Sequence, residues 1–64
     1  MDSASVHKRE SIIFNTIDVI NECGIHSVST KEVAKRLGIS EGTIFKYFPK
    51  KKDLLYAVLE YFSK

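Results

Sequence analysis

The sequence predicts an all-α fold of four helices, with the second and third joined by a tight turn as a helix-turn-helix. Apolar residues recur three and four positions apart in four successive segments, and no alternation long enough for a strand is present. Glycines follow the first two segments, while serine or threonine stands where the second and third begin. At 64 residues the chain has room for a single small domain.

The first helix is predicted from about Ser5 to Cys23. It ends before Gly24, because glycine most readily takes the left-handed conformation that closes a helix. In the connector that follows, Ile25 and Val28 are expected to turn inward. The apolar stripe of this helix is formed by Ile12, Ile13, Ile17, Val19, Ile20 and Cys23.

The second helix begins at Ser29 or Thr30. Either hydroxyl can cap the free N–H groups of the first turn, and Ser29 with Glu32 also matches a capping box. The helix ends at Gly38. Its predicted apolar face consists of Val33, Ala34 and Leu37.

The third helix is predicted from about residue 41 to residue 47 or 48. Only Ile39 separates Gly38 from the next capping residue, Ser40, and this spacing is typical of a helix-turn-helix. Pro49 ends the helix, because proline disfavours a helical residue before it and has no N–H to donate.

The fourth helix starts near Lys51, and its pattern is still helical at Lys64. We therefore expect a fragment, or a last helix that continues into a further part. Phe48 and Phe62 are expected in the core, as is Phe14 unless it belongs to an exposed patch. The apolar stripe of the fourth helix is Leu54, Leu55, Val58, Leu59 and Phe62.

Composition argues against several classes of protein. The single cysteine, Cys23, cannot form an internal disulfide, which agrees with a reducing, cytoplasmic location. We see neither a secretory leader nor an apolar run of the roughly 20 residues that a membrane span needs. Cys23 and His26 lack the further ligands of a zinc site, and no nucleophile–base set is visible. We therefore expect no enzyme, no catalytic residue, no metal and no cofactor.

The net charge of +2 hides an uneven distribution of charge along the chain. From Thr30 to Lys52 there are seven basic and two acidic residues, a net charge of +5, whereas the remainder has a net charge of −3. Clustered positive charge is typical of proteins that bind an anionic partner, nucleic acid first. Taken alone, Lys50, Lys51 and Lys52 would be only a solvated turn.

The third helix combines an apolar back with a polar front. Ile44 and Phe48 lie four positions apart and are expected to pack on the second helix. The residues left mostly outside are Glu41, Gly42, Thr43, Lys46 and Tyr47, with Phe45 on the border.

This polar front is chemically suited to the major groove of DNA. Thr43 and Lys46 can meet base edges, and Gly42 allows a close approach of the backbone. Tyr47 and Lys51 can meet phosphate oxygens. On a purely structural interpretation, Phe45 and Tyr47 would instead pack against the fourth helix.

The segment TKEVAKRLGISEGTIFKYFPKKKDLL resembles the DNA-binding domain of the TetR family of bacterial transcriptional regulators, and the resemblance extends from about Glu10 to Leu59. The matching positions are Thr30, Val33–Ala34, Gly38–Ile39–Ser40, Gly42–Thr43–Ile44, Tyr47–Phe48, Lys51 and Asp53–Leu54–Leu55. The resemblance implies a homeodomain-like, three-helix helix-turn-helix domain followed by a fourth helix, spanning residues 1–64.

The resemblance also implies roles for single residues. Thr30 resembles the phosphate-binding residue at the start of the second helix, and Lys31 lies where a side chain can reach a base or the backbone. Phe45 stands where the family usually has Tyr, so the phosphate bond from that hydroxyl is in doubt. Glu41 could accept from cytosine N4 or simply face water. The predicted contact set is Thr30, Lys31, Ser40, Glu41, Gly42, Thr43, Phe45, Lys46, Tyr47 and Lys51.

The resemblance therefore implies a sequence-specific transcriptional repressor that binds a palindromic site on double-stranded DNA as a homodimer. It further implies a C-terminal domain, absent from this chain, that dimerises and binds a small-molecule inducer. The alternative is a small helical protein–protein interaction module. In that case exposed Leu, Phe and Tyr side chains of the fourth helix would dock a partner, and the lysines would serve only solubility.

Overall fold

The computed structural model describes residues 3–63 and contains four α-helices and no strand within that range. The helices are α1 (Ser3–Cys23), α2 (Thr30–Leu37), α3 (Glu41–Tyr47) and α4 (Lys51–Ser63). The predicted all-α fold is confirmed, and α1 begins slightly earlier than the sequence pattern suggested.

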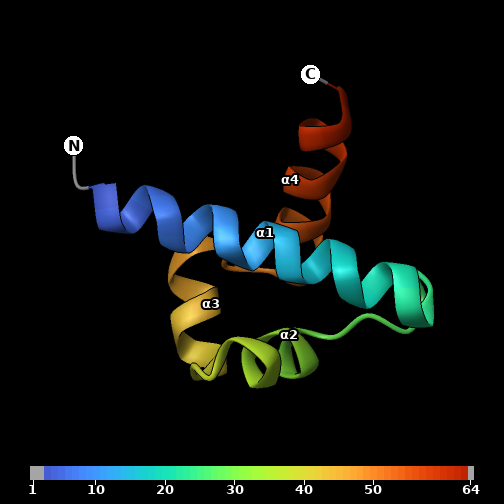
Figure 1. The fold of residues 1–64 in the computed structure, drawn as a ribbon, viewed down its shortest axis with the longest axis horizontal. Helices are drawn as coiled ribbons and strands as arrows, with labels where there is room; N and C mark the ends of the chain where they lie inside the picture. Colours follow the sequence, from blue (N-terminus) through green and yellow to red (C-terminus); the bar gives the residue numbers. More distant parts are fainter. Residues whose placement is uncertain (1–2, 64) are drawn as a thin grey trace.

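The long helix α1 lies across the molecule, with α2 and α3 on one side of it and α4 rising on the other (Figure 1). Helix α1 packs against both α2 and α4, while α2 packs against α3. The Cα envelope measures 33 × 28 × 18 Å. Helices α2 and α3 therefore form the helix-turn-helix, and α1 connects it to α4 by packing against both α2 and α4.

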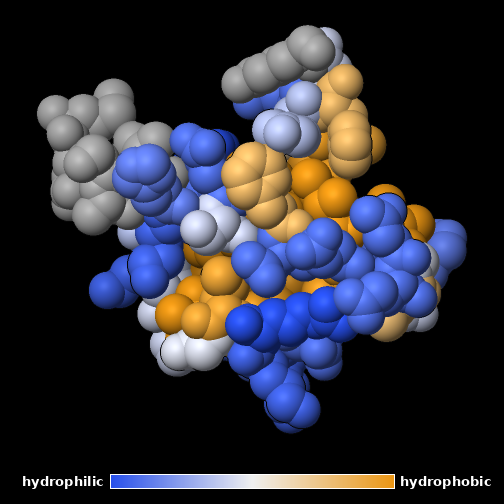
Figure 2. All heavy atoms as spheres, in the orientation of Figure 1, coloured by the Kyte–Doolittle hydropathy of each residue, from blue (hydrophilic) through white to orange (hydrophobic). Residues whose placement is uncertain are grey.

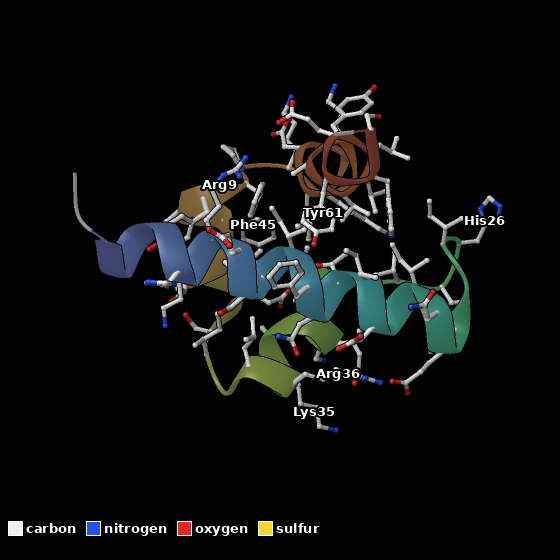
Figure 3. All side chains as sticks on the ribbon, turned by 45° about the horizontal axis from the view of Figure 1, so that its top comes forward. Arg9, His26, Lys35, Arg36, Phe45 and Tyr61 are labelled. Carbon is white, nitrogen blue, oxygen red and sulfur yellow. The ribbon has the colours of Figure 1, made fainter. Side chains whose placement is uncertain are left out.

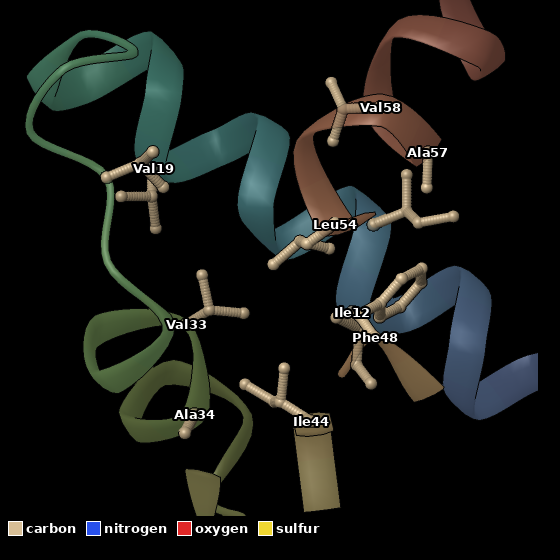
Figure 4. Packing of buried hydrophobic residues seen from close by; sticks show 11 residues of the cluster. Ile12, Val19, Val33, Ala34, Ile44, Phe48, Leu54, Ala57 and Val58 are labelled. Atoms are coloured by element: carbon tan, nitrogen blue, oxygen red, sulfur yellow. The ribbon is translucent and has the colours of Figure 1, made fainter. Parts of the chain in front are cut away.

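The core lies where the helices meet and is built from aliphatic side chains with one aromatic ring (Figure 4). Thr16 is fully buried, and its hydroxyl donates to the carbonyl of Ile12 at 2.7 Å. Within residues 7–63, no buried polar side-chain atom is left without a partner. The buried apolar residues are Ile12, Ile13, Val19, Val28, Val33, Ala34, Ile44, Phe48, Leu54, Ala57 and Val58.

Serine side chains start both helices of the helix-turn-helix. Ser29 has an extended backbone, with φ −136° and ψ 149°, and its Oγ accepts from the N–H of Glu32 at 3.1 Å. Ser29 is thus the cap of α2, and Thr30 is the first helical residue. Ser40 caps α3 in the same way, accepting from the N–H of Thr43 at 3.3 Å.

The turn between α2 and α3 is formed by Gly38. Its φ of 70° lies in the left-handed region that glycine tolerates best. The N–H of Gly38 donates to the carbonyl of Lys35 at 3.2 Å, and the N–H of Ile39 donates to that of Ala34 at 3.0 Å. This pair of bonds is a Schellman motif, which satisfies the last carbonyls of α2 and redirects the chain within two residues.

The junction between α3 and α4 is equally local. Phe48 has an extended backbone, with φ −135° and ψ 90°, as expected for a residue before proline. At the start of α4, the carboxylate of Asp53 accepts from the N–H of Lys50 at 3.1 Å. This bond satisfies one of the free donors at the helix start.

Five side chains at predicted inward positions are exposed, among them Leu59 of α4 at 54%; for Phe14, an exposed patch was the stated alternative. Cys23 is exposed because the last turn of α1 projects past α2 and α4 (Figure 1). Phe62 is 66% exposed because the distal end of α4 rises away from α1. Phe14 is 41% exposed and packs edge-to-face on Tyr61 of α4, with ring centroids 5.2 Å apart. Ile25 is exposed on the connector between α1 and α2.

The conformation of Gly38 gives a sharp test of the turn. An added Cβ at Gly38 would meet no heavy atom within 4 Å, so any loss of stability must come from the backbone. Gly38→Ala is expected to lower the free energy of unfolding by about 1–2 kcal/mol, because alanine disfavours positive φ. Urea unfolding followed by circular dichroism measures this change.

Gly42→Ala is the matched control. Gly42 lies in α3, and its added Cβ would meet only the Oγ of Ser40 at 3.6 Å, an ordinary contact. This variant should be as stable as the original chain or more stable, by up to about 1 kcal/mol. Equal losses at Gly38 and Gly42 would contradict the assignment of the turn to the conformation of Gly38.

Candidate nucleic-acid interface

The inner face of α3 is anchored in the core. Ile44 is 0% exposed and Phe48 is 3% exposed, and both belong to the same cluster as Val33 and Ala34 of α2 (Figure 4). The guanidinium of Arg9, from α1, lies 5.1 Å from the centre of the Phe48 ring. The inward orientation predicted for Ile44 and Phe48 is therefore confirmed.

Six residues of the predicted contact set form what we call the outer face of α3. Four of them are exposed, namely Glu41, Gly42, Phe45 and Lys46. The other two, Thr43 and Tyr47, are half-buried at its margin. Phe45 is 40% exposed, so it lies at the border between the two faces as predicted. This short helix thus presents hydroxyl and ammonium groups and the Phe45 ring outward, while the half-buried ring of Tyr47 also packs against the core cluster.

Two hydroxyls lie together at the start of α3. The Oγ of Ser40 is 3.1 Å from the Oγ1 of Thr43, and it also accepts from the N–H of that residue. Ser40 is therefore engaged as a helix cap. The hydroxyl of Thr43 is held at the exposed end of the helix, next to Ser40.

A hydrogen bond joins the first residues of α2 and α3. The hydroxyl of Thr30 donates to the Oε2 of Glu41 at 2.9 Å. Both residues were predicted as separate contacts, with Glu41 accepting from a base or facing water. Their pairing was not predicted, because they lie 11 positions apart and meet only through the turn at Gly38.

The lysines of the basic segment are all exposed, but they do not form one cluster. Lys31 and Lys35 lie on α2, and Lys35 points away from the bundle (Figure 3). Lys51 lies at the start of α4, beside the connector between α1 and α2. There it borders a shallow depression of about 530 Å³, which is lined by Ile25, His26, Lys51, Lys52 and Leu55.

His26 was considered only as a metal ligand and was not in the predicted contact set. It points outward from the connector (Figure 3) and borders the same depression as Lys51. No sequence signal links these two residues, because one follows α1 and the other begins α4.

Arg36 contributes less free charge than the sequence suggested. Its guanidinium donates to both carboxylate oxygens of Glu22, at 2.6 and 2.9 Å, and to Glu32 at 3.2 Å. These bonds lower the pKa of the Glu22 carboxyl below its ordinary value and raise the pKa of Arg36 above its own. The ion pair joins α1 to α2, so one of the seven cations of the basic segment is already paired.

Between residues 3 and 63 the structure contains neither a metal-binding cluster nor a membrane-spanning helix. No group of three or more His, Cys, Asp or Glu residues could hold a metal ion there. No helix in that range is long and apolar enough to cross a membrane. A hollow of about 270 Å³ between α1 and α4 is lined by Arg9, Glu10, Ile13, Ala57, Glu60 and Tyr61.

Comparison with known proteins agrees with this geometry. Residues 12–58 match the family described as bacterial regulatory proteins, tetR family. The chain belongs to the TetR family. This confirms the resemblance found in the sequence and the helix-turn-helix fold class. TetR-family proteins are transcriptional regulators rather than enzymes, in agreement with the expectation from the sequence.

The chain is similar to several helix-turn-helix regulators. It is 41% identical over 54 residues to the HTH-type transcriptional regulator BetI of Yersinia pestis (strain Pestoides F), a match covering 84% of this chain and 27% of that protein. BetI of Klebsiella pneumoniae (strain 342) is 40% identical over 52 residues, covering 81% of this chain and 27% of the relative. BetI of Serratia proteamaculans (strain 568) is 37% identical over 54 residues, covering 84% and 27%. This TetR-family chain thus spans about a quarter of the length of these relatives, and no solved structure gave a significant match.

The ion pair between Glu22 and Arg36 predicts a pH-dependent contribution to stability. Because the folded pKa of Glu22 is lowered, the contribution is present above the unfolded pKa and is lost as pH falls through the folded pKa. Glu22→Gln is therefore expected to lower Tm slightly at pH 7, with the difference shrinking as pH falls below the ordinary glutamate pKa of about 4.3, and shrinking also at high salt.

Thermal unfolding at several pH values and salt concentrations measures this effect. Asp18→Asn removes the same charge from the same helix, outside the ion pair with Arg36, and serves as control. A Tm difference for Glu22→Gln that persists at low pH would show that the ion pair is not its cause.

Proposed function

We propose that this chain, over residues 1–64, is the sequence-specific DNA-binding domain of a TetR-family transcriptional regulator. The observation that carries the proposal is the two-sided structure of α3. Ile44 and Phe48 are buried beneath the helix, while the outer face is exposed directly after the sharp turn at Gly38. A helix presented in this way can enter the major groove of double-stranded DNA, which is about 12 Å wide.

The outer face supplies the chemistry for contacts to bases. Thr43 offers a hydroxyl and a methyl group, which suit a base edge and a thymine methyl. Lys46 is exposed and can donate to guanine O6 or N7. Gly42 leaves room for the backbone to approach the duplex, and Phe45 adds apolar contact at the border of the face.

Phosphate contacts surround these base contacts in the proposal. Tyr47 and Thr30 can donate hydroxyl hydrogens to phosphate oxygens, and Lys31 and Lys51 can meet the backbone as charges. Ser40, whose side chain caps α3, belongs to the proposed contact set as a DNA-binding residue beside Thr43.

The whole protein is proposed from the family. We infer a homodimer, joined through a C-terminal domain absent from this chain, that places two α3 helices in successive major grooves of a palindromic operator. A small-molecule inducer bound to that domain would release the DNA, which makes the protein a repressor. We place it in the cytoplasm, where its DNA is.

One observation favours the alternative of a protein–protein interaction module. Apolar side chains gather over α4 in Figure 2, and its exposed members include Tyr56 at 64% and Leu59 at 54%. A partner could dock on this face through mainly apolar contacts. The salt dependence of binding distinguishes the two functions.

Binding to a DNA duplex should weaken steeply between about 50 and 200 mM salt, because each neutralised phosphate releases counterions. Lys51→Ala should weaken binding to all DNA sequences. It should also reduce the magnitude of the slope of log K against log salt concentration by about one. Fluorescence anisotropy with a labelled duplex measures both quantities.

Tyr56→Ala is the control for this salt experiment. It alters the exposed face of α4 and should leave the affinity for DNA and its salt slope unchanged. Loss of DNA binding on Tyr56→Ala, together with an unchanged slope for Lys51→Ala, would favour the interaction module.

Thr43→Ala tests base recognition rather than phosphate contact. It should relax the preference at one or two base pairs of a duplex selected from random oligonucleotides, at a cost of about 1–3 kcal/mol. Affinities for the selected duplex and for single base-pair variants of it measure the effect. If Thr43→Ala and Lys51→Ala both leave binding intact, the assigned contact surface is wrong.

A further inference from the structure

The hydrogen bond between Thr30 and Glu41 occupies two groups that DNA would need. Thr30 is the first residue of α2 and Glu41 the first of α3, and the hydroxyl donates to the carboxylate at 2.9 Å. A threonine hydroxyl has a single hydrogen to donate. In the free protein that hydrogen points to Glu41, so it cannot be given to a phosphate at the same time.

The carboxylate of Glu41 also has no cationic partner among the described residues. The basic segment from Thr30 to Lys52 contains two acidic residues, and Glu32 is paired with Arg36 at 3.2 Å. Glu41 is held by a neutral hydroxyl, and among residues 3–63 it takes part in no ion pair. A carboxylate with no ion-pair partner among residues 3–63 therefore lies at the exposed start of α3.

This anion opposes a phosphate placed where Thr30 could bind it. Two like charges within a few ångströms at a surface repel each other, and like charges facing each other across an interface suppress wrong partners. Glu41 therefore disfavours DNA unless the carboxylate finds a donor on the DNA itself. In the major groove, the donor that a glutamate pairs with is the amino group of cytosine N4.

We propose that Glu41 determines specificity through an exchange of partners with Thr30. At a matching site the carboxylate accepts from a cytosine N4 amino group, and the freed hydroxyl donates to a phosphate. At other sites the carboxylate keeps the hydroxyl and repels the backbone. This inference rests on the proposed function and identifies one residue that separates the operator from other DNA.

A purely structural role for Glu41 makes different predictions. An acidic residue in the first turn of a helix interacts favourably with the helix dipole, and Glu41 has that position in α3. Such a role would change the stability of the fold and would affect all DNA sequences equally. The exchange changes the ratio of affinities between sequences.

The test compares Glu41→Gln with Glu60→Gln, which removes the same charge from the exposed surface of α4. Two probes are used, a duplex selected by the original chain from random oligonucleotides and a random duplex of equal length, both at low salt. Glu41→Gln should bind the random duplex about 5–10-fold more tightly. The ratio of selected to random affinity should fall at least about tenfold. Glu60→Gln should leave that ratio unchanged.

Thr30→Val provides the second measurement. Because one bond links the two side chains, the effects of Thr30→Val and Glu41→Gln on affinity for the selected duplex should be non-additive in a double-mutant cycle. Additive effects would overturn the exchange. So would a ratio of selected to random affinity that neither Glu41→Gln nor Glu60→Gln changes. Neither result would contradict DNA binding itself. If the folded original chain binds neither duplex, the proposed function itself is wrong.

Discussion

The burial of Ile44 is the contact on which the rest of the molecule depends. Helix α3 has only 7 residues, and isolated helices shorter than about 12–15 residues are marginal in water. It persists because Ile44 and Phe48 are enclosed by the other helices and because Ser40 caps its start. The core therefore decides how the outer face of α3 is presented, although no residue of the core lies on that face.

The fold was largely visible in the sequence because its boundaries are local. Gly38, Ser40 and Pro49 each act on neighbours within a few positions, so their effect does not depend on the remainder of the chain. Side-chain burial was less predictable where a helix extends past its partners. Cys23 and Phe62 lie in such projecting turns, and helical periodicity carries no information about the length of the neighbouring helix.

In the candidate interface, too, only the features set by near neighbours in the sequence could be predicted. The residue types on α3 and their division into two faces follow from periodicity, and the structure places Ile44 and Phe48 inward as expected. The bonds from Thr30 to Glu41 and from Arg36 to Glu22 span 11 and 14 positions. They depend on how α1, α2 and α3 are oriented in space, which no short-range pattern encodes. Counting charges along the sequence therefore overstated the free positive charge.

Among the described residues, the polar side-chain contacts between helices lie at the surface. The one buried polar side chain of residues 7–63, Thr16, bonds within its own helix, whereas Thr30–Glu41 and Arg36–Glu22 join different helices in contact with water. Inside the bundle, only the shapes of apolar side chains determine the angle of one helix to the next. Sliding of packed helices by small amounts breaks no buried hydrogen bond, and shear of this kind is a common way for domains to change state. Small sliding movements at the helix–helix interfaces are therefore opposed mainly by the surface bonds. Salt, pH or a bound ligand can reach these bonds.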